Sequence, residues 1–484
     1  CAEPSHAYVR LADLLAEGRR LRSSGDRLAE ERAAGIRPED LFTLIYTSGT
    51  TGIPKGVMLT HQSMISQVRL VPITVTPRDR AIAILPIWHI LERVYEMILI
   101  AGGACAYYSS IRTLKEDFAE VRPTLMVSAP RLWESVYQGI LAHVKKQPPV
   151  RQALFSAAYY SARKVQTARR YLAGRRLKLT CPPAHRVWLG GLWHGVVLAA
   201  FLVPYLALDP LVLRKLRAAL GGQLQSTLSG GGALPRQVDE FFNNIGIPVQ
   251  EGYGLTETCP VLSVRTGRGM VIGTVGPLIP QTELRLLDLE TREVIYPPRR
   301  GVMGEVHVRG PQVMEGYYKD PEGTARVLSD GWLNTGDLGI VTHNGCLRIV
   351  GRSKDTIVLL GGENVEPAPI ENTLRESPLI DQCMVVGQDR KTLGALVIPR
   401  QSALQAYGED LEALAQSEEA RQAVMRDIRR LVSRANGFKG FELVTNCRLL
   451  PKPFEVGDEL TNLFKLRRQV VAEKYAAEIR SLYQ

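Results

Sequence analysis

The sequence predicts an α/β protein in which a large, multi-layer domain with parallel-rich sheets is followed by a small α+β domain. Short apolar runs at 41–46, 81–85, 124–127 and 248–250 alternate with longer segments of helical periodicity, as expected when helices connect parallel strands. Residues 281–310 break this pattern, because short alternating runs there are separated by turn signals. They predict a small antiparallel barrel or sheet within the large domain.

Chain length and a polar junction predict how the domains divide. At 484 residues and 45% apolar content, the chain is long enough for two or more domains. The charged sequence GRSKD begins at Gly351, and this composition is typical of a hinge. We therefore predict a large domain over 1–351 and a small, mobile lid domain over 352–484. Seven cysteines without a CxxC pair indicate neither a disulfide framework nor a zinc site, and favour a reducing cytosol.

The strongest local signal is YTSGTTGIPKG, from Tyr46 to Gly56. It follows a strand-like run and precedes a helix for which Thr60 is the expected cap, so it predicts a strand-to-helix turn. Backbone N–H groups, hydroxyls and the Lys55 cation can together surround phosphate oxygens. The spacing differs from GxxxxGK[ST], which excludes a P-loop NTPase, and an ordinary glycine-rich turn is the structural alternative. The predicted phosphate-binding residues are Thr47, Ser48, Gly49, Thr50, Thr51, Gly52 and Lys55.

This string resembles the phosphate loop of the adenylate-forming superfamily, which includes acyl-CoA synthetases, luciferases and the adenylation domains of peptide synthetases. Further motifs follow in the order of that family: SGGGALP at 229–235, EGYGLTET at 251–258, GWLNTGDLG at 331–339 and GRSKDTIVLLGGENVEP at 351–367. Five ordered motifs across nearly the whole chain are much more specific than any one of them.

The resemblance implies an ATP site assembled from these motifs. A substrate carboxylate must attack the α-phosphate, and the repulsion between two anions has to be offset by cations and donors. Glu257 would hold Mg²⁺ and Thr256 would contact phosphate, although a solvated turn also explains Glu257. Asp337 would bind the ribose hydroxyls with the help of Arg352, although a loop cap also explains Asp337. The implied adenine-side residues are Gly230, Gly231, Gly232, Gly254 and, stacked on the base, Tyr253.

Two lysines imply a reaction in two steps. Lys465, in LTNLFKLRR, matches the lysine that reaches the reacting carboxylate and α-phosphate from the small domain, although a solvated surface charge is the alternative. Long-chain synthetases usually have Thr-Pro-Thr ahead of this lysine, where this chain has Thr461-Asn462-Leu463. Lys354 matches the pivot about which the lid rotates between acyl-AMP formation and CoA entry, with AMP and pyrophosphate as products.

Two segments indicate which acid is activated. LPIWHILERVYE at 85–96 and APRLWESV at 129–136 resemble segments of long-chain fatty acyl-CoA synthetases, which places His89 near the acyl and pantetheine channels. A satisfied core histidine is the alternative. The predicted enzyme joins a long-chain fatty acid to CoA using ATP and Mg²⁺. Rival hypotheses are a ligase that uses acyl carrier protein, a ligase that stops at acyl-AMP, and a catalytically silent, membrane-docked nucleotide-binding protein; the sequence does not indicate an oligomeric state.

The formal charge of +11 is concentrated in one segment. Between Ser135 and Leu208 there is no Asp or Glu, whereas eleven Lys and Arg occur, and the segment ends in an uncharged run from Val187 to Leu208 with two tryptophans. A basic stretch beside a Trp-bearing apolar one is typical of a membrane interface, where each cation contributes roughly 1 kcal/mol. Nucleic-acid binding is disfavoured, because the basic stretch adjoins an apolar run rather than aromatics arranged for bases.

The apolar run at 187–208 has three possible structures. Its length just permits a transmembrane helix, but the nucleotide motifs precede and follow it, and one crossing would separate them. Pro204 and the Gly190-Gly191 pair also favour an interfacial helix or re-entrant hairpin, with a buried core helix as the alternative. We predict peripheral contact of 140–213 with the inner, cytoplasmic face of a membrane.

The beginning of the chain gives one further expectation. The first residue is Cys1 rather than Met, and no secretory signal pattern follows it. The phosphate-binding turn begins near residue 46, whereas in the resembling family it lies well over a hundred residues from the start. We therefore expect the large domain to be N-terminally incomplete.

Overall fold

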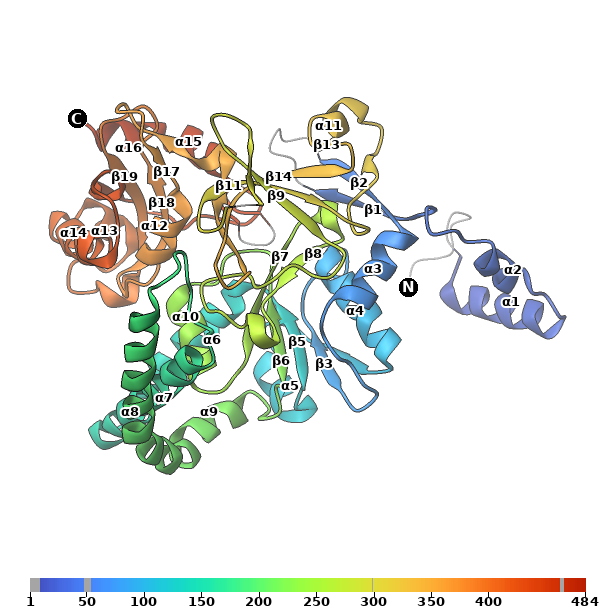
Figure 1. The fold of residues 1–484 in the computed structure, drawn as a ribbon, viewed down its shortest axis with the longest axis horizontal. Coiled ribbons are helices and arrows are strands. Elements are labelled where there is room, and N and C mark those ends of the chain that lie inside the picture. The colour runs from blue at the N-terminus through green and yellow to red at the C-terminus, as the bar shows by residue number, and fades with distance from the viewer. Residues whose placement is uncertain (1–8, 48–53, 298, 462–464) are drawn as a thin grey trace.

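The computed structural model describes residues 9–47, 54–297, 299–461 and 465–484 (Figure 1). A sheet in the order β4-β3-β5-β6-β7-β8 lies at the centre of the large domain. All of its neighbouring pairs are parallel except β7 and β8, so the predicted parallel sheet is confirmed. Its strands are β3 (Arg80–Ala83), β4 (Cys105–Tyr108), β5 (Leu125–Ser128), β6 (Ser226–Ser229), β7 (Val249–Gly254) and β8 (Val261–Val264).

Helices cover this sheet and complete its core. Trp133 of one helix is 1% exposed and its ring lies 4.9 Å from that of Phe242 on another, in an edge-on arrangement. Such aromatic pairs add packing energy beyond the area they bury. The helices are α3 (His61–Leu70), α4 (Ile90–Gly102), α5 (Leu114–Val121), α6 (Pro130–Lys145) and α10 (Arg236–Asn244), while α1 (Leu11–Ser23) and α2 (Leu28–Ala34) stand apart from the body (Figure 1).

The predicted phosphate-binding sequence falls between two strands of the chain, which corrects the predicted strand-to-helix connection. Strand β1 (Leu41–Thr47) pairs antiparallel with β2 (Lys55–Thr60), and α3 begins only after β2. The backbone ladder between the strands explains the difference, because it satisfies polar groups that a direct turn into a helix would leave unpaired. Thr60 is the predicted helix cap, and its hydroxyl accepts the Ser63 N–H at 3.1 Å.

A second sheet is antiparallel, as predicted for residues 281–310. Its order is β10-β9-β11-β14-β13, with β15 paired to β14. The β14–β15 register places Asp337 opposite Arg352, so residues of two predicted nucleotide motifs become neighbours. A short strand, β12 (Gly316–Tyr317), pairs with β2. The other strands are β9 (Glu283–Leu287), β10 (Val294–Tyr296), β11 (Met303–Arg309), β13 (Leu328–Ser329), β14 (Trp332–Val341) and β15 (Leu347–Arg352); the short helix α11 (Pro321–Ala325) follows β12.

The C-terminal unit has the predicted α+β character and a hydrophobic core of its own. Strands β18 and β19 are antiparallel, and β19 and β20 are parallel. A 3₁₀ turn at Ser353–Asp355 connects β15 to this unit; the mobility of the unit stays a prediction. Its elements are β16 (Ile357–Val358), β17 (Asn364–Val365), α12 (Pro367–Leu374), β18 (Ile380–Val386), β19 (Leu393–Pro399), α13 (Leu411–Gln416), α14 (Glu418–Leu431), β20 (Val444–Leu449), α15 (Arg468–Lys474) and α16 (Ala476–Ser481).

The basic and apolar segments form a helical hairpin between β5 and β6. Helix α7 (Pro149–Leu172) packs against α8 (Ala184–Leu208), which continues through a π-helical turn into α9 (Arg214–Ala219). Within the described residues one helix, Ala184–Ala219, is long and apolar enough to cross a membrane by length and composition. No residue of α8 is buried, so the alternative of a buried core helix for 187–208 is wrong.

Candidate active site

The sequence motifs meet in one large cleft of about 3770 Å³ that both the large domain and the C-terminal unit line. The cleft opens along the ends of β6 and β7, beside β14 and β15. Ser48, Gly49, Thr50, Thr51 and Gly52 lie outside the described residues, as do Asn462 and Leu463. The other predicted site residues all line the cleft: Thr47, Lys55, His89, Gly230, Gly231, Gly232, Tyr253, Gly254, Thr256, Glu257, Asp337, Arg352, Lys354 and Lys465.

One tyrosine, Tyr317, contacts both Lys55 and Glu257. The Tyr317 hydroxyl donates a hydrogen bond of 2.9 Å to Glu257 Oε1, and Lys55 Nζ lies 4.6 Å from the centre of the same ring. Burial and the charge of Glu257 raise the pKa of Tyr317, so its hydroxyl stays a donor at neutral pH. Asp320 is 3.9 Å from Lys55 Nζ. This arrangement presents a cation and a carboxylate at one end of the cleft.

The predicted adenosine-binding residues form a second polar group. The Tyr253 hydroxyl donates to Asp337 Oδ2 at 2.8 Å, and Arg352 Nε donates to Asp337 Oδ1 at 2.9 Å. Asp337 is 4% exposed, and paired charges of this kind are held in fixed geometry because an unpaired buried carboxylate is costly. Asp337 is therefore held in one orientation at the cleft, with an arginine beside it; its ribose-binding role stays a prediction.

The glycine loop after β6 is fixed by backbone contacts. Gly230 N–H donates to the Ser128 carbonyl at 3.0 Å, and a Cβ on Gly230 would lie 2.8 Å from Leu91. Gly231 has a φ of +82°, a conformation that favours glycine. A Cβ on Gly254, at the end of β7, would lie 1.6 Å from the Pro260 carbonyl oxygen. These glycines allow close approaches that a side chain would block.

Lys465 comes from the C-terminal unit and faces the large domain. Its main-chain N–H donates to Thr461 Oγ1 at 3.1 Å. Solvent reaches its side chain through the open cleft, but protein surrounds it on several sides. This desolvation lowers the pKa of Lys465, and the positive charge of Arg352 lowers it further. The negative charges of Asp337 and Glu257 act in the opposite direction but are outweighed. The charges that act on it are those of the predicted nucleotide site.

His89 has a structural contact as well as a place in the cleft. Its Nδ1 accepts the Leu91 N–H at 3.2 Å and caps α4, which supports the structural alternative for this residue. Burial, followed by the nearby charge of Lys465, lowers the pKa of His89 to about 4. The ring is therefore neutral at pH 7, and its second nitrogen carries the proton that Nδ1 lacks.

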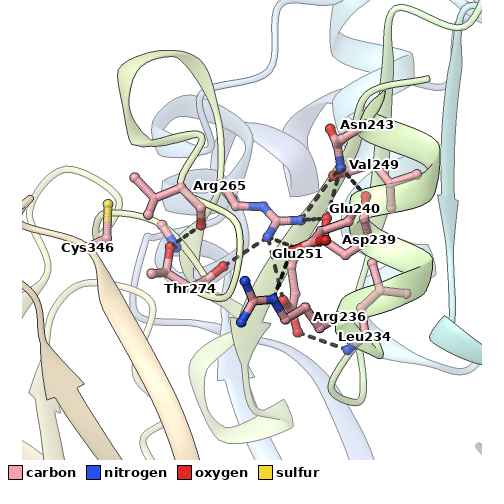
Figure 2. Close-up of polar contacts among 12 residues, drawn as sticks. Leu234, Arg236, Asp239, Glu240, Asn243, Val249, Glu251, Arg265, Thr274 and Cys346 are labelled. Atoms are coloured by element: carbon pink, nitrogen blue, oxygen red, sulfur yellow. Dashed lines mark hydrogen bonds and ion pairs between the residues drawn. The ribbon is translucent and has the colours of Figure 1, made fainter. Parts of the chain in front are cut away.

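A buried ion cluster supports the glycine loop from behind (Figure 2). Arg265 is fully buried and donates to both Asp239 oxygens, at 2.6 and 2.7 Å. Glu251 Oε2 lies 4.0 Å from the same guanidinium, and Glu251 Oε1 accepts the Leu234 N–H at 3.0 Å. Leu234 belongs to the SGGGALP motif and Glu251 begins EGYGLTET. The cluster thus ties two nucleotide motifs together.

Sequence reasoning missed Tyr317 and Arg265. Tyr317 lies in no motif, and only the pairing of β12 with β2 brings it beside Lys55. Arg265 follows the buried strand β8, and an arginine directly after a run of four apolar or small residues is a signal that could have indicated a buried cation.

The possible metal ligands of the cleft determine which type of ion it can hold. Among the described residues there is no cluster of three or more His, Cys, Asp or Glu side chains suited to a metal. A single carboxylate, Glu257, fits Mg²⁺, because this ion is usually bound by one or two carboxylates together with substrate phosphates and water. A single carboxylate does not suit a metal ion that is held by protein ligands alone.

The fold is that of an adenylation domain. The chain is similar to the adenylation domain of a carboxylate reductase from Mycobacterium chelonae, with a TM-score of 0.68 and 24% identity over 98% of this chain and 67% of that one. A likeness at this identity establishes the fold.

The family follows from sequence. Residues 3–318 match the model of the AMP-binding enzyme family and residues 354–484 that of the AMP-binding enzyme C-terminal domain. The chain belongs to the AMP-binding enzyme family, the adenylate-forming superfamily that its motifs resemble.

Relatives of this chain are named for several different activities. The chain is 40% identical to a probable acyl-activating enzyme 16, chloroplastic, of Arabidopsis thaliana, over 93% of this chain and 64% of the relative. It is 35% identical to a long-chain-fatty-acid–[acyl-carrier-protein] ligase, AEE15, of the same plant, over 99% and 66%. It is 34% identical to the long-chain-fatty-acid–CoA ligase FadD15 of Mycobacterium bovis, over 93% and 71%. The chain thus spans about two thirds of the length of these relatives.

Proposed function

We propose that the protein activates a long-chain fatty acid with ATP and transfers the acyl group to CoA. A carboxylate oxygen attacks the α-phosphorus and pyrophosphate leaves, which gives acyl-AMP. The CoA sulfur then attacks the acyl carbon, loses its proton and displaces AMP. The observation that carries this proposal is the convergence of Lys55, Glu257 and Lys465 on one cleft, although they come from three distant parts of the chain.

Each of these residues has a task that its surroundings support. Lys55 offsets phosphate charge, and Lys465 does the same for the reacting carboxylate and α-phosphate, where two anions must meet. Mg²⁺ bound with ATP would neutralise further phosphate charge beside Glu257. Asp337 and Arg352 hold the nucleoside, since their mutual contact fixes both before ATP enters. Lys354, at the 3₁₀ turn between the domains, is the proposed pivot for lid rotation.

The acceptor thiol has two candidates of one chemical class. CoA and acyl carrier protein both present a pantetheine thiol, and the curated relatives include ligases for each. CoA is the proposed acceptor, and the carrier protein is the second candidate because the carrier-protein ligase is 35% identical over 99% of this chain. We place the reaction at the cytoplasmic face of a membrane, with residues 140–213 in peripheral contact, because a long-chain acid is concentrated there.

The test separates the two chemical steps. Pyrophosphate release is measured with acids of graded chain length, and CoA or carrier protein is then added to the adenylate. We expect Lys465→Ala to slow adenylate formation by about a hundredfold or more, as loss of one charge-stabilising group does in other enzymes. Thioester formation from supplied acyl-AMP should be largely retained. Lys452→Ala, an exposed lysine of the same unit outside the cleft, serves as the matched control.

Three results would contradict parts of this proposal. Equal loss of both steps in Lys465→Ala would remove the assigned role of this lysine. Absence of pyrophosphate release with every acid, together with measurable ATP binding in calorimetry, would favour the catalytically silent alternative. If a thioester forms with carrier protein but not with CoA, carrier protein rather than CoA is the acceptor.

A further inference from the structure

The outer face of α8 is apolar along its whole length and no part of the described chain buries it. Leu189, Leu192, Val196, Val203 and Leu206 are between 54% and 72% exposed. Their spacing of three, four and seven residues places them on one side of the helix. Trp188 and Trp193 lie on the same face, 69% and 65% exposed. A helix that is apolar on all sides requires an apolar neighbour on each of them, and this face lacks one.

The inner face of α8 is fixed to the domain by α7. Helix α7 is anchored in the core of the large domain, where Ala158 and Ala162 are buried in one cluster with Phe241. Tyr171 stacks on His194 with 4.2 Å between ring centres, and a Cβ on Gly190 would lie 1.8 Å from the Tyr171 hydroxyl. The hairpin is therefore a packed element of the fold, and the outer face of α8 stays available to a partner.

The charges around this face indicate what the partner is. Lys164 lies 5.2 Å from the Tyr160 ring, and that ring packs on Phe201 of α8, 5.6 Å away. Arg169 lies 5.9 Å from the ring of Tyr205, also on α8. These cations line the seam between the helices, and no acidic side chain occurs from 135 to 208 to neutralise them.

The end of the helix carries no free anion. Asp209, which follows α8, is paired with Arg217 through two hydrogen bonds, one of them 2.8 Å long. Apolar and aromatic side chains bordered by these cations match the acyl and headgroup layers of an anionic bilayer.

The topology excludes a single crossing. Strands β5 and β6 immediately flank the α6 to α9 segment, and they pair with each other in the central sheet, Leu125 opposite Ser226. The chain before and after the hairpin is therefore on one side of the membrane. In Figure 1 α7 and α8 lie together at the outer edge of the large domain, away from the central strands.

We infer that α8 lies along the surface of an anionic bilayer, with its outer face in the acyl layer and the α7 cations at the headgroups. The connection between α7 and α8 borders the cleft of the predicted nucleotide motifs, because Arg175 and Leu177 line it, as does His194 of α8. A fatty acid that leaves the bilayer beside α8 thus has a short path into the cleft. This path rests on the proposed function, whereas the docking surface does not.

The first test is co-sedimentation with vesicles of phosphatidylcholine alone or mixed with phosphatidylglycerol. We expect binding to the mixed vesicles that weakens as salt is raised, since exposed charges are screened. Trp188→Gln/Trp193→Gln should reduce the partition coefficient about tenfold or more, because each ring removes roughly 200 Å² from water. Leu11→Gln/Leu15→Gln, on the exposed helix α1, is the matched control and should bind like the unaltered protein.

The second test concerns the cations. Lys164→Gln/Arg169→Gln/Arg186→Gln should lose about a hundredfold in binding to the anionic vesicles, from roughly 1 kcal/mol per cation at about tenfold per 1.4 kcal/mol, with little change on neutral ones. Replacement of the exposed Arg19, Arg27 and Arg32 by Gln is the control for net charge. Equal losses in both triple variants would show a general charge effect and overturn the assigned surface.

Other outcomes separate docking from activity. Unchanged sedimentation of the double tryptophan variant, or no binding to either vesicle, would overturn the inference. So would a vesicle-free dimer that the double variant abolishes, because a second copy would then cover α8. With water-soluble octanoate, pyrophosphate release should be equal in the unaltered protein and the tryptophan variant. If release is absent in both while vesicle binding persists, the proposed function fails and the docking surface stands.

Discussion

Replacement of Glu251 by Gln gives a test of the buried cluster behind the glycine loop. Burial raises the pKa of Glu251 to about 7, and the nearby charge of Arg265 only partly offsets this effect. Because the folded-state pKa is raised, the folded protein binds more protons than the unfolded chain between pH 4.5, the usual pKa of a glutamate, and about pH 7. Its stability therefore decreases as pH rises through this window.

The size of the effect follows from the same values. A carboxyl with an unfolded pKa of 4.5 and a folded pKa of about 7 contributes a loss of about 2.5 kcal/mol between roughly pH 5 and 8, at 1.36 kcal/mol per pKa unit. Gln cannot ionise, and its amide oxygen can still accept the Leu234 N–H that Glu251 accepts at 3.0 Å. Glu251→Gln should therefore lose the pH-dependent part and keep the contact with the glycine loop.

The assay is urea unfolding of the protein and the variant at several pH values from 5 to 8. We expect the free energy of unfolding of Glu251→Gln, measured relative to the unaltered protein, to increase by about 2.5 kcal/mol over this range. A difference that stays constant with pH would refute the assignment of a raised pKa to Glu251. A variant whose ATP affinity falls with no change in stability would instead point to a direct role in the site.

Three further predictions concern the site and the core. Tyr317→Phe removes the donor to Glu257 and should lower kcat/KM for ATP about tenfold, since a hydrogen bond to a charged group contributes roughly 1.5 kcal/mol or more; an unchanged value would show that this contact does not orient Glu257. Asp337→Asn leaves Arg352 without its anion and should raise KM for ATP about tenfold, and a change confined to the KM for the acid would contradict the nucleoside assignment. Trp133→Ala should lower the free energy of unfolding by about 4 kcal/mol because it opens a cavity in a packed core, and a loss below about 1 kcal/mol would show that the site collapses.

Much of the fold followed from local patterns. The short runs at 41–46 and 124–127 became strands because β-branched and apolar residues between turn signals favour a buried strand. Thr60 capped the following helix as predicted. The intervening strand β2 was missed, because KGVMLT is a strand through its pairing with β1 and β12, and local propensity does not specify pairing partners.

The sequence by itself determined the family and the types of group in the site, because five motifs with fixed order and spacing carry both. It also determined that residues 135–208 are basic and then apolar, since this is a property of composition. Tertiary structure alone decided that α8 is exposed rather than buried, because burial depends on which elements pack around a helix. It also decided that Tyr317 lies between Lys55 and Glu257 and that the charges of Arg352 and Asp337 act on Lys465, since chain order alone does not bring these residues together.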